Sequence, residues 1–380
     1  MIKVLFFLPN LGNGGAEKVL VNLVNNMNTK KFDITVMTLF DIGENRERLN
    51  QNIRYISCMK KAYKGVVQLM KCATPELLHK LFIKDSYDVE IAYLEGIATR
   101  IISGCHNLNT KKIAWVHTEF SDDTFAAHVY RNFNETVKCY EKYDAIACVS
   151  AQVCRRFCEL VNIAPEKVVV QYNTNESDHI RELAKEPVTD CVFSEYEFKI
   201  IAVGKIIQNK GFDRLARALK KLIADHLHPH IYIVGVGEDK EKIEKYLTDE
   251  GISHAFTFLG YKKNPYSYVS RCDLFVCSSY REGFSTAATE ALIVGTPVLT
   301  VDVSGMRELL GEHNDYGIIV PNDDASLYQG IRDYIVNSEL HQKYRKLAEE
   351  RGERFNRDVT VAETENLLIS VAQNKEGEKC

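Results

Sequence analysis

The chain contains two series of short, almost uninterrupted apolar runs that alternate with segments long enough to form helices. Strands with one solvated face alternate apolar and polar residues, whereas parallel strands buried on both faces are apolar throughout. The sequence therefore predicts two doubly wound parallel sheets, joined by right-handed helical crossovers. We expect strands at Val4–Leu8, Ile34–Leu39, Val89–Tyr93, Ile113–Val116, Ala145–Val149 and Val168–Gln171, and, in the second series, at Phe198–Val203, Ile231–Val234, Phe256–Leu259, Leu274–Cys277, Pro297–Val301 and Gly317–Val320.

A length of 380 residues fits two domains of ordinary size. We predict an N-terminal α/β domain over residues 1–175 and a C-terminal α/β domain over residues 198–355. The polar segment 176–197, which contains Pro187, is predicted to link them. Residues 356–380 are expected to form a C-terminal helix and tail that return toward the N-terminal domain.

Composition excludes several classes of protein. A net charge of -4 argues against a nucleic-acid partner, and the 45% apolar and 26% charged residues are typical of a globular chain. The eleven cysteines include no CxxC pair, which favours free thiols in a reducing compartment over a zinc site. The first apolar run ends at Pro9 and is too short for a signal peptide, and no stretch approaches the ~20 apolar residues of a membrane span. We expect a cytoplasmic protein whose membrane contact, if any, is peripheral and at the inner face of the cell membrane.

The segment 281–292 follows an expected strand and carries two carboxylates. Glu282 precedes a predicted helix and Glu290 lies inside it, so the two side chains can reach opposite ends of one elongated ligand. A carboxylate can accept two hydrogen bonds from the vicinal diol of a ribose or hexose. A local cap for Glu282 and a solvated helix position for Glu290 explain the same residues equally well.

Small residues between the two glutamates suit a binding loop. Gly283 allows the backbone to approach a ligand closely, and Ser285 or Thr286 can cap the helix, whose first amides favour an anion.

Two further glycine-flanked loops follow expected strands. Lys205 and Lys210 could stabilise a departing phosphate without a metal, although a solvated loop is the simpler interpretation of two lysines. Near the N-terminus, Gly12-Asn13-Gly14-Gly15 precedes a helix. It lacks the G-K-[ST] of a P-loop and the third glycine of G-x-G-x-x-G, so a tight helix-packing turn is its default interpretation.

The combined string resembles a known family. Glu282 and Glu290 match the E-x7-E motif of the family-4 retaining glycosyltransferases (glycosyltransferase group 1 type) of the GT-B fold, and residues 291–298 resemble the continuation A-x-x-x-G-x-P-V. The resemblance is strongest over 198–321 and looser over 1–175. It implies two Rossmann-like domains whose parallel sheets face a central cleft, with the acceptor on the N-terminal side and the nucleotide-sugar donor on the C-terminal side.

The resemblance also implies residue roles. Glu282, His117 and Lys210 would be catalytic. The residues that would bind the donor phosphates are Lys205, Lys210, Gly14, Gly15, Ser285 and Thr286, where Lys205 replaces an arginine that is usual in the family. The residues that would meet the donor sugar are His117, Glu282, Gly283 and Phe284. Glu290 would hold the ribose, and Gly260 and Tyr261 would read the base. From their positions on loops after strands, and not from the resemblance, Glu95 and Glu119 are candidates to face the acceptor.

These features predict a metal-independent hexosyltransferase that moves a hexose or N-acetylhexosamine from a nucleotide-diphosphate sugar, a UDP-sugar foremost, to a hydroxyl acceptor. The resemblance implies that the transfer retains configuration. By analogy with the family, the expected acceptor is a lipid-linked saccharide in surface polysaccharide biosynthesis. The sequence contains no D-x-D metal signature, so no metal and no other cofactor is expected. Alternatives on a similar scaffold are a sugar-nucleotide epimerase, a glycan phosphorylase, a catalytically silent nucleotide-sugar-binding partner and a nicotinamide-dependent dehydrogenase.

The segment 59–84 is basic and amphipathic. It carries six lysines against one acid, Glu76, with apolar residues interleaved. Such a segment can lie on an anionic membrane surface. Core packing with a solvated basic face is the plainer alternative.

Overall fold

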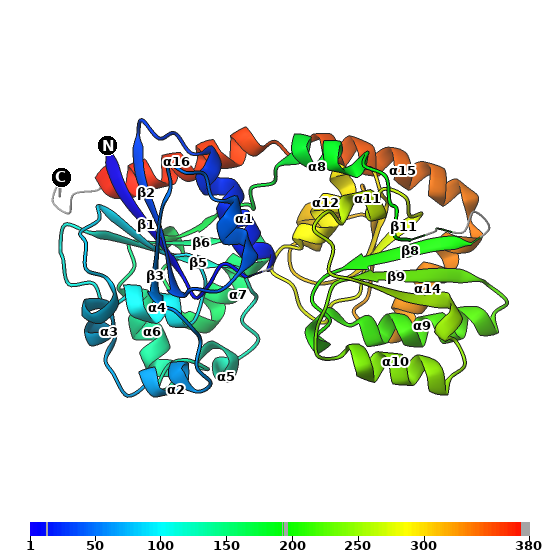
Figure 1. Cartoon of the computed structure of the whole chain (residues 1–380), viewed down its shortest axis with the longest axis horizontal. Coiled ribbons are helices and arrows are strands. Elements are labelled where there is room, and N and C mark those ends of the chain that lie inside the picture. The colour runs from blue at the N-terminus through cyan, green and yellow to red at the C-terminus, as the bar shows by residue number, and fades with distance from the viewer. Residues whose placement is uncertain (13, 192, 194–196, 374–380) are drawn as a thin grey trace. The chain divides into compact units, whose positions relative to one another are not determined.

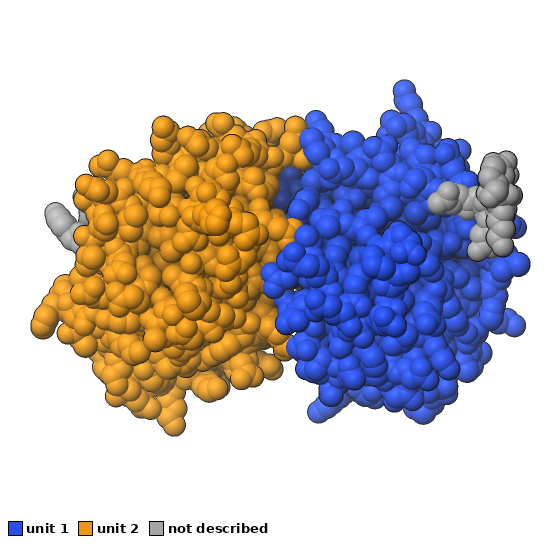
Figure 2. All heavy atoms as spheres, turned by 180° about the vertical axis from the view of Figure 1, so that it is seen from behind, with its two compact units in different colours: residues 1–175, 357–380 blue, residues 176–356 orange. Residues whose placement is uncertain are grey.

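The computed structural model describes residues 1–12, 14–191, 193 and 197–373. Asn13 of the glycine loop, residues 192 and 194–196 of the expected linker, and the tail 374–380 lie outside the described residues. The chain divides into two compact units, residues 1–175 with 357–380 and residues 176–356, which Figure 2 colours separately. Each unit contains one parallel sheet with helices on both faces (Figure 1), which confirms the predicted two-domain Rossmann-like α/β fold.

The first unit is built on a seven-stranded sheet in the order β3-β2-β1-β4-β5-β6-β7, with all neighbouring strands parallel. Its strands are β1 Ile2–Leu8, β2 Phe32–Phe40, β3 Arg54–Met59, β4 Val89–Ala92, β5 Lys111–Val116, β6 Ala145–Cys148 and β7 Val168–Val170. Its helices are α1 Gly15–Asn26, η1 Glu44–Arg48, α2 Val66–Met70, α3 Pro75–Phe82, α4 Ile97–Ile102, α5 Asp123–Ala126, α6 Phe133–Glu141, α7 Ala151–Val161, η2 Pro165–Lys167 and α16 Arg357–Gln373.

The second unit is built on a six-stranded parallel sheet in the order β10-β9-β8-β11-β12-β13. Its strands are β8 Phe198–Val203, β9 Pro229–Val234, β10 Phe256–Gly260, β11 Leu274–Cys277, β12 Val298–Val301 and β13 Ile318–Val320. Its helices are α8 Ser177–Ala184, η3 Gln208–Lys210, α9 Phe212–Ala224, α10 Lys240–Asp249, η4 Ser253–Ala255, α11 Tyr266–Val269, α12 Thr286–Ile293, α13 Met306–Leu310, α14 Asp324–Val336 and α15 Ser338–Glu353.

Every strand expected from the apolar runs is present, but one strand was missed. β3 pairs only with β2 at the edge of the first sheet, and none of its residues is fully buried. An edge strand has one neighbour and does not need an apolar run, so the mixed sequence of β3 gives no strand signal. A hydrogen bond of 2.8 Å between the hydroxyls of Tyr55 on β3 and Thr38 on β2 also joins the two strands.

The segments at the domain junctions are packed elements. Helix α8, within the segment expected to be a linker, contacts α11 and α12, and the Ser177 hydroxyl donates to the Phe355 carbonyl at 2.7 Å. The described part of that segment therefore groups with the second unit. Helix α16 contacts α1 and β4, and its Glu365 carboxylate accepts from the Asn28 amide at 2.6 Å, so α16 groups with the first unit.

Glycines allow the loops after adjacent strands of the second sheet to touch through their backbones. Gly235, after β9, has a φ of 149°, and a Cβ there would lie 1.8 Å from the carbonyl oxygen of Gly204, after β8. A Cβ on Gly211 would lie 2.1 Å from the carbonyl oxygen of Ser278, after β11. The loops at this edge of the sheet are therefore packed without intervening side chains.

The contact at Gly235 can be tested by adding a methyl group. Gly251 is a matched control, because its φ of 70° is also positive but a Cβ there would meet nothing within 4 Å. We expect Gly251→Ala to lower the free energy of unfolding by about 1–2 kcal/mol, the usual cost of a left-handed backbone. Gly235→Ala should cost more than that in urea unfolding followed by circular dichroism, because it adds a clash with the backbone. Equal losses in the two variants would contradict the close packing.

Candidate active site

Ligands of open parallel sheets bind beyond the carboxyl ends of strands, at the point where the strand order reverses. In the second sheet this point lies between β8 and β11, which are adjacent in space but far apart in sequence. The loop after β8 carries Lys205 and Lys210, and the loop after β11 carries Glu282. The topology thus brings two separately predicted motifs to the same place.

Lys210 and Glu282 form an ion pair across this switch point. The Lys210 Nζ atom lies 2.6 Å from Glu282 Oε1, and the Ser279 hydroxyl donates to the same oxygen at 2.6 Å. A Cβ on Gly204 would lie 3.6 Å from the Lys210 side chain, which therefore runs over the bare backbone of that glycine. Burial favours the neutral amine, but the negative charge of Glu282 outweighs it and raises the pKa of Lys210. Lys210 is a fixed cation.

Backbone contacts hold the two loops together. The Ser278 hydroxyl donates to the Lys210 carbonyl at 3.0 Å, and the Tyr280 amide donates to the Asn209 carbonyl at 2.9 Å. The Asn209 side-chain amide donates to the Arg281 carbonyl at 3.0 Å. These contacts orient the charged pair before any ligand arrives.

The remaining part of the E-x7-E segment forms the start of α12. The Ser285 hydroxyl caps the helix by accepting from the Ala288 amide at 3.3 Å, and Thr286 is the first helical residue. Glu290 is buried on α12, and its Oε1 accepts from the Tyr266 hydroxyl at 3.5 Å. The solvated helix position considered for Glu290 is therefore wrong.

The residues just before α12 are held by a second glycine contact. A Cβ on Gly305 would lie 2.7 Å from the Gly283 carbonyl oxygen and 2.8 Å from the Phe284 ring. Gly283 itself is buried and Phe284 is half-buried. The loop that connects Glu282 to α12 thus rests directly on the backbone before α13.

Other predicted donor residues lie on neighbouring loops. The carbonyl of Gly260, at the end of β10, accepts from the Gly235 amide at 2.9 Å, and Tyr261 beside it is 47% exposed. Lys205 is exposed, and no ion pair joins it to Glu282 in the part of the chain that the structure describes. The structure therefore brings Lys210, but not Lys205, into contact with Glu282.

The first sheet has its own switch point, between β1 and β4. Gly14 is the N-cap of α1 and Gly15 its first residue. A Cβ on Gly14 would lie 2.0 Å from Glu17 Oε2, so this carboxylate folds over the glycine predicted to meet the donor phosphates. Sequence reasoning missed Glu17, although an acid in the first turn of a helix is a recognisable signal.

His117 and Glu95 meet beyond β4 and β5. The His117 backbone amide donates to Glu95 Oε2 at 2.9 Å. Burial raises the pKa of Glu95, although hydrogen bonds from His117 and Thr118 oppose the shift. The imidazole of His117 packs against the Tyr93 ring, with centroids 4.9 Å apart, and its buried Nε2 has no hydrogen-bond partner among the described residues.

Burial lowers the pKa of His117 to about 3, although a hydrogen bond at the Tyr93 backbone acts to raise it. The ring is therefore neutral at physiological pH and can exchange a hydrogen bond with a hydroxyl without adding charge. Glu119, the other predicted acceptor residue, instead pairs with Arg156, whose Nε lies 3.3 Å from Glu119 Oε1. Ser279, Tyr266 and Arg156 were not predicted from the sequence, because each is recognisable only through its spatial partner.

Comparisons with known proteins match both units of the chain. Residues 13–174 match the model of Glycosyltransferase Family 4, and residues 191–351 match the model of Glycosyl transferases group 1. The chain belongs to the group 1, family 4 glycosyltransferases. It is therefore a transferase enzyme, as the motifs predict.

Relatives span the whole chain. A Campylobacter jejuni protein, N-acetylgalactosamine-N,N'-diacetylbacillosaminyl-diphospho-undecaprenol 4-alpha-N-acetylgalactosaminyltransferase, is 25% identical over 94% of this chain and 96% of its own length. An uncharacterized Haemophilus influenzae glycosyltransferase is 24% identical over 93% of this chain and 97% of its own. Among solved structures, Anabaena Alr3699/HepE in complex with UDP and glucose superposes with a TM-score of 0.76 at 18% identity, covering 97% of this chain and 100% of that one.

The environment of His117 predicts an unusual titration. The unfolded chain takes up a proton at this histidine near pH 6.5, whereas the folded ring does so only near pH 3. Acidification between these values should therefore destabilise the folded protein, because the unfolded state binds the extra proton. We expect the His117 ring resonances, identified by their loss in His117→Asn, to show no titration between pH 8 and pH 5 in NMR spectra. A midpoint near 6.5 would contradict the buried, neutral ring.

Proposed function

We propose that this glycosyltransferase moves a hexose or N-acetylhexosamine from a nucleotide-diphosphate sugar, in particular a UDP-sugar, to a hydroxyl of a lipid-linked saccharide, with retention of configuration and without a catalytic metal. The observation that carries the proposal is the Lys210–Glu282 ion pair at the switch point of the second sheet. The UDP and glucose bound to the Anabaena relative support the donor class. The diphospho-undecaprenol acceptor in the name of the Campylobacter relative supports the acceptor class.

Departure of a nucleoside diphosphate places negative charge on its phosphate oxygens. A preorganised cation stabilises that charge in the transition state without having to reorganise. Lys210 meets this requirement, since its ammonium is already oriented by Glu282 and its pKa is raised by the negative charge that offsets its burial. Lys205, which is exposed on the same loop, and the capped start of α12 are proposed to supplement it.

Glu282 pairs with Lys210 and is proposed to bind the donor sugar in addition. Its contacts within the described residues, from Lys210 and Ser279, converge on Oε1. Oε2 is therefore the oxygen proposed to accept from sugar hydroxyls. Glu290, held by Tyr266, is proposed to accept from the ribose hydroxyls.

In the first unit, neutral His117 is proposed to orient a hydroxyl of the donor sugar through its buried Nε2. Glu95, whose pKa is raised by burial, is proposed to face the acceptor. Retention and metal independence rest on the family resemblance of the E-x7-E segment and on Lys210, which supplies the positive charge that a metal would otherwise supply.

The first test is release of free nucleoside diphosphate from a panel of nucleotide-sugars, with EDTA present and no metal added. We expect slow release that is selective for one donor. Lys210→Met should reduce this release by roughly 100- to 1,000-fold, the usual cost of one preorganised donor to the transition state. Glu282→Gln should reduce both release and donor binding measured by calorimetry.

Lys220→Met is the matched control, because Lys220 pairs with Glu250 on the surface of the same unit, 2.6 Å away, outside the predicted site. It should behave as wild type. Donor binding without turnover would point to a missing acceptor or a silent partner. Absence of binding for every donor would overturn the proposal, and a requirement for added metal would overturn its metal-independent part.

We also propose that the segment 59–84 contacts the membrane that carries the acceptor. Its only acid, Glu76, is engaged by Lys142 at 2.7 Å, which lowers the pKa of Glu76 to about 2 against the opposing effect of burial. None of the six lysines of the segment forms an ion pair within the described residues. Leu69, Leu77 and Leu81 are 70%, 58% and 56% exposed. The segment therefore presents both unbalanced positive charge and apolar side chains.

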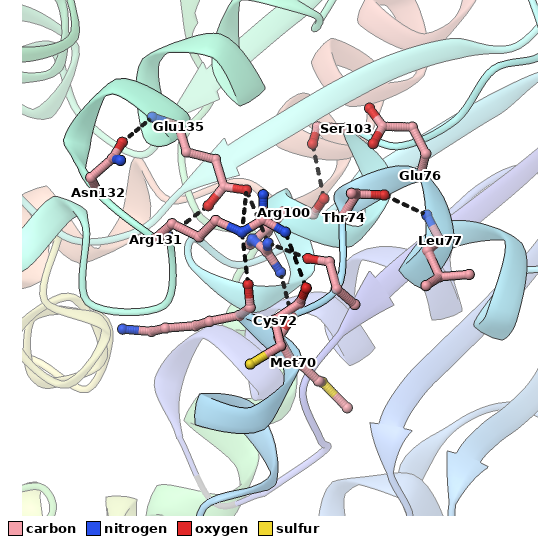
Figure 3. Close-up of polar contacts among 12 residues, drawn as sticks. Met70, Cys72, Thr74, Glu76, Leu77, Arg100, Ser103, Arg131, Asn132 and Glu135 are labelled. Atoms are coloured by element: carbon pink, nitrogen blue, oxygen red, sulfur yellow. Dashed lines mark hydrogen bonds and ion pairs between the residues drawn. The ribbon is translucent and has the colours of Figure 1, made fainter.

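Two arginines fix this segment on the first unit (Figure 3). Arg100, fully buried on α4, donates to the carbonyls of Met70 and Ala73 at 2.9 and 2.7 Å, and pairs with Glu135 at 2.9 Å. Arg131 donates to the carbonyls of residues 71 and 72 at 2.9 and 3.2 Å. The two guanidinium groups thus cover the carbonyl end of α2, a favourable place for positive charge. The described residues contain no helix that is long and apolar enough to cross a bilayer, so the proposed contact is with the membrane surface.

Vesicle sedimentation tests this contact. Wild type should bind vesicles containing an anionic phospholipid more tightly than neutral ones, and less tightly at high salt. Replacing Lys60, Lys61 and Lys64 together by alanine should weaken binding by roughly 100-fold, since each lysine contributes about 1 kcal/mol. Val359→Ser removes an exposed apolar side chain of the same unit outside the segment and should leave binding unchanged. Equal binding by the triple variant and wild type would contradict the proposal.

A further inference from the structure

A cluster of metal-ligating side chains lies in the first unit, on residues that the proposed reaction does not use. His79 on α3, Glu90 on β4 and Cys105 after α4 each direct one potential ligand atom to a common point, and these atoms all lie within 4.8 Å of one another. Glu90 is only 2% exposed, Cys105 is buried, and His79 Nε2 lies 2.7 Å from Glu90 Oε2. The three residues come from separate elements, so the cluster exists only in the folded chain.

The cluster borders a cavity of about 300 Å³, which is also lined by His106 and Thr110. A cavity of this size has room for an ion together with a water ligand. Thr110 closes the amino end of β5 by donating to the Tyr87 carbonyl at 2.7 Å. The cavity therefore lies at the amino-end edge of the first sheet, whereas the loop that carries His117 lies at the carboxyl-end edge.

The chemistry of the three side chains indicates which metal ion they would bind. One imidazole, one thiolate and one carboxylate are ligands that Zn²⁺ combines, at about 2.0–2.3 Å each. In a tetrahedral site with these bond lengths the ligand atoms are roughly 3.4–3.6 Å apart. The 2.7 Å contact between His79 and Glu90 is shorter than this spacing and has to open by less than about 1 Å to admit an ion.

We propose that His79, Glu90 and Cys105 form a binding site for one divalent transition-metal ion, with Zn²⁺ the best match, and that the cavity supplies a water as the fourth ligand. Without a metal, the site is an ion pair. Burial favours the neutral ring, but hydrogen bonds to Cys105 and Glu90 outweigh it and raise the pKa of His79 to about 9. The metal replaces the protons of the imidazole and the thiol, so its binding releases protons.

A metal here would tie three elements together. It would join α3, which belongs to the segment 59–84, to the central strand β4 and to the turn after α4. A Cβ on Gly104 would lie 2.1 Å from the Pro75 carbonyl oxygen, so the turn and the start of α3 already touch. The bound ion would therefore raise the thermal stability of the first unit and hold the basic segment in place. It would not take part in sugar transfer.

Cobalt substitution tests the site in the full-length protein after treatment with a chelator. Co²⁺ should bind with one equivalent per chain and produce the near-ultraviolet charge-transfer band of a cobalt thiolate, and Zn²⁺ should displace it. Cys105→Ala should abolish the band. Glu90→Gln should weaken binding by more than the roughly 10- to 100-fold that loss of an outer-shell partner costs. The melting temperature of wild type should rise on addition of Zn²⁺, and that of Cys105→Ala should rise less.

Cys72→Ser is the matched control, because Cys72 is an exposed thiol of the same unit outside the cluster. It should retain the band and the metal-dependent increase in melting temperature. Absence of a thiolate band in folded wild type would overturn the proposal and leave the cluster as an ion pair beside a thiol. A band that survives Cys105→Ala, with folding verified by circular dichroism, would also overturn it. Nucleotide release is measured separately and does not affect either outcome.

Discussion

The ion pair between Lys210 and Glu282 depends on parallel strand pairing, and so does the rest of the candidate site. Because β8 and β11 are parallel neighbours, their following loops leave the sheet at the same edge, although 72 residues separate the two charged side chains. The glycine contacts between these loops then remove the side chains that would keep the backbones apart. Desolvating a carboxylate or an ammonium is costly, and the partly buried Lys210 and Glu282 offset this cost by lying 2.6 Å apart.

The candidate site residues of the two units differ in whether their charged or their neutral forms are favoured. In the second unit, charge is retained, since pairing with Glu282 raises the pKa of Lys210 in spite of burial. At His117 and Glu95 of the first unit the uncharged forms are favoured, since burial lowers the pKa of His117 and raises that of Glu95. Fixed charge suits a departing diphosphate, whereas neutral hydrogen-bonding groups suit sugar hydroxyls.

A separate set of features lies along the segment 59–84, which runs from the end of β3 to the crossover before β4. The segment 59–84 is fixed by Arg100 and Arg131, while its leucines and lysines remain outside the core. The cluster around Glu90 lies against the same segment through His79. The proposed membrane contact and the proposed metal site therefore share this segment, which does not include the residues proposed to carry the chemistry.

The sequence by itself determined the sheets and the position of each binding motif. Continuous apolar runs predicted all strands except β3, whose mixed polar and apolar residues are at most partly buried. Local motifs predicted Glu282, Glu290 and Lys210, since their chemistry and their position after strands are visible in a short window. Tertiary structure alone decided which of these side chains meet. Glu282 forms its ion pair with Lys210 and not with Lys205. Glu119 forms an ion pair with Arg156. His79, Glu90 and Cys105 come together from elements whose spacing shows no metal motif. The physical reason is that ion pairs, pKa shifts and ligand clusters depend on distances between residues far apart in the chain, which only packing establishes.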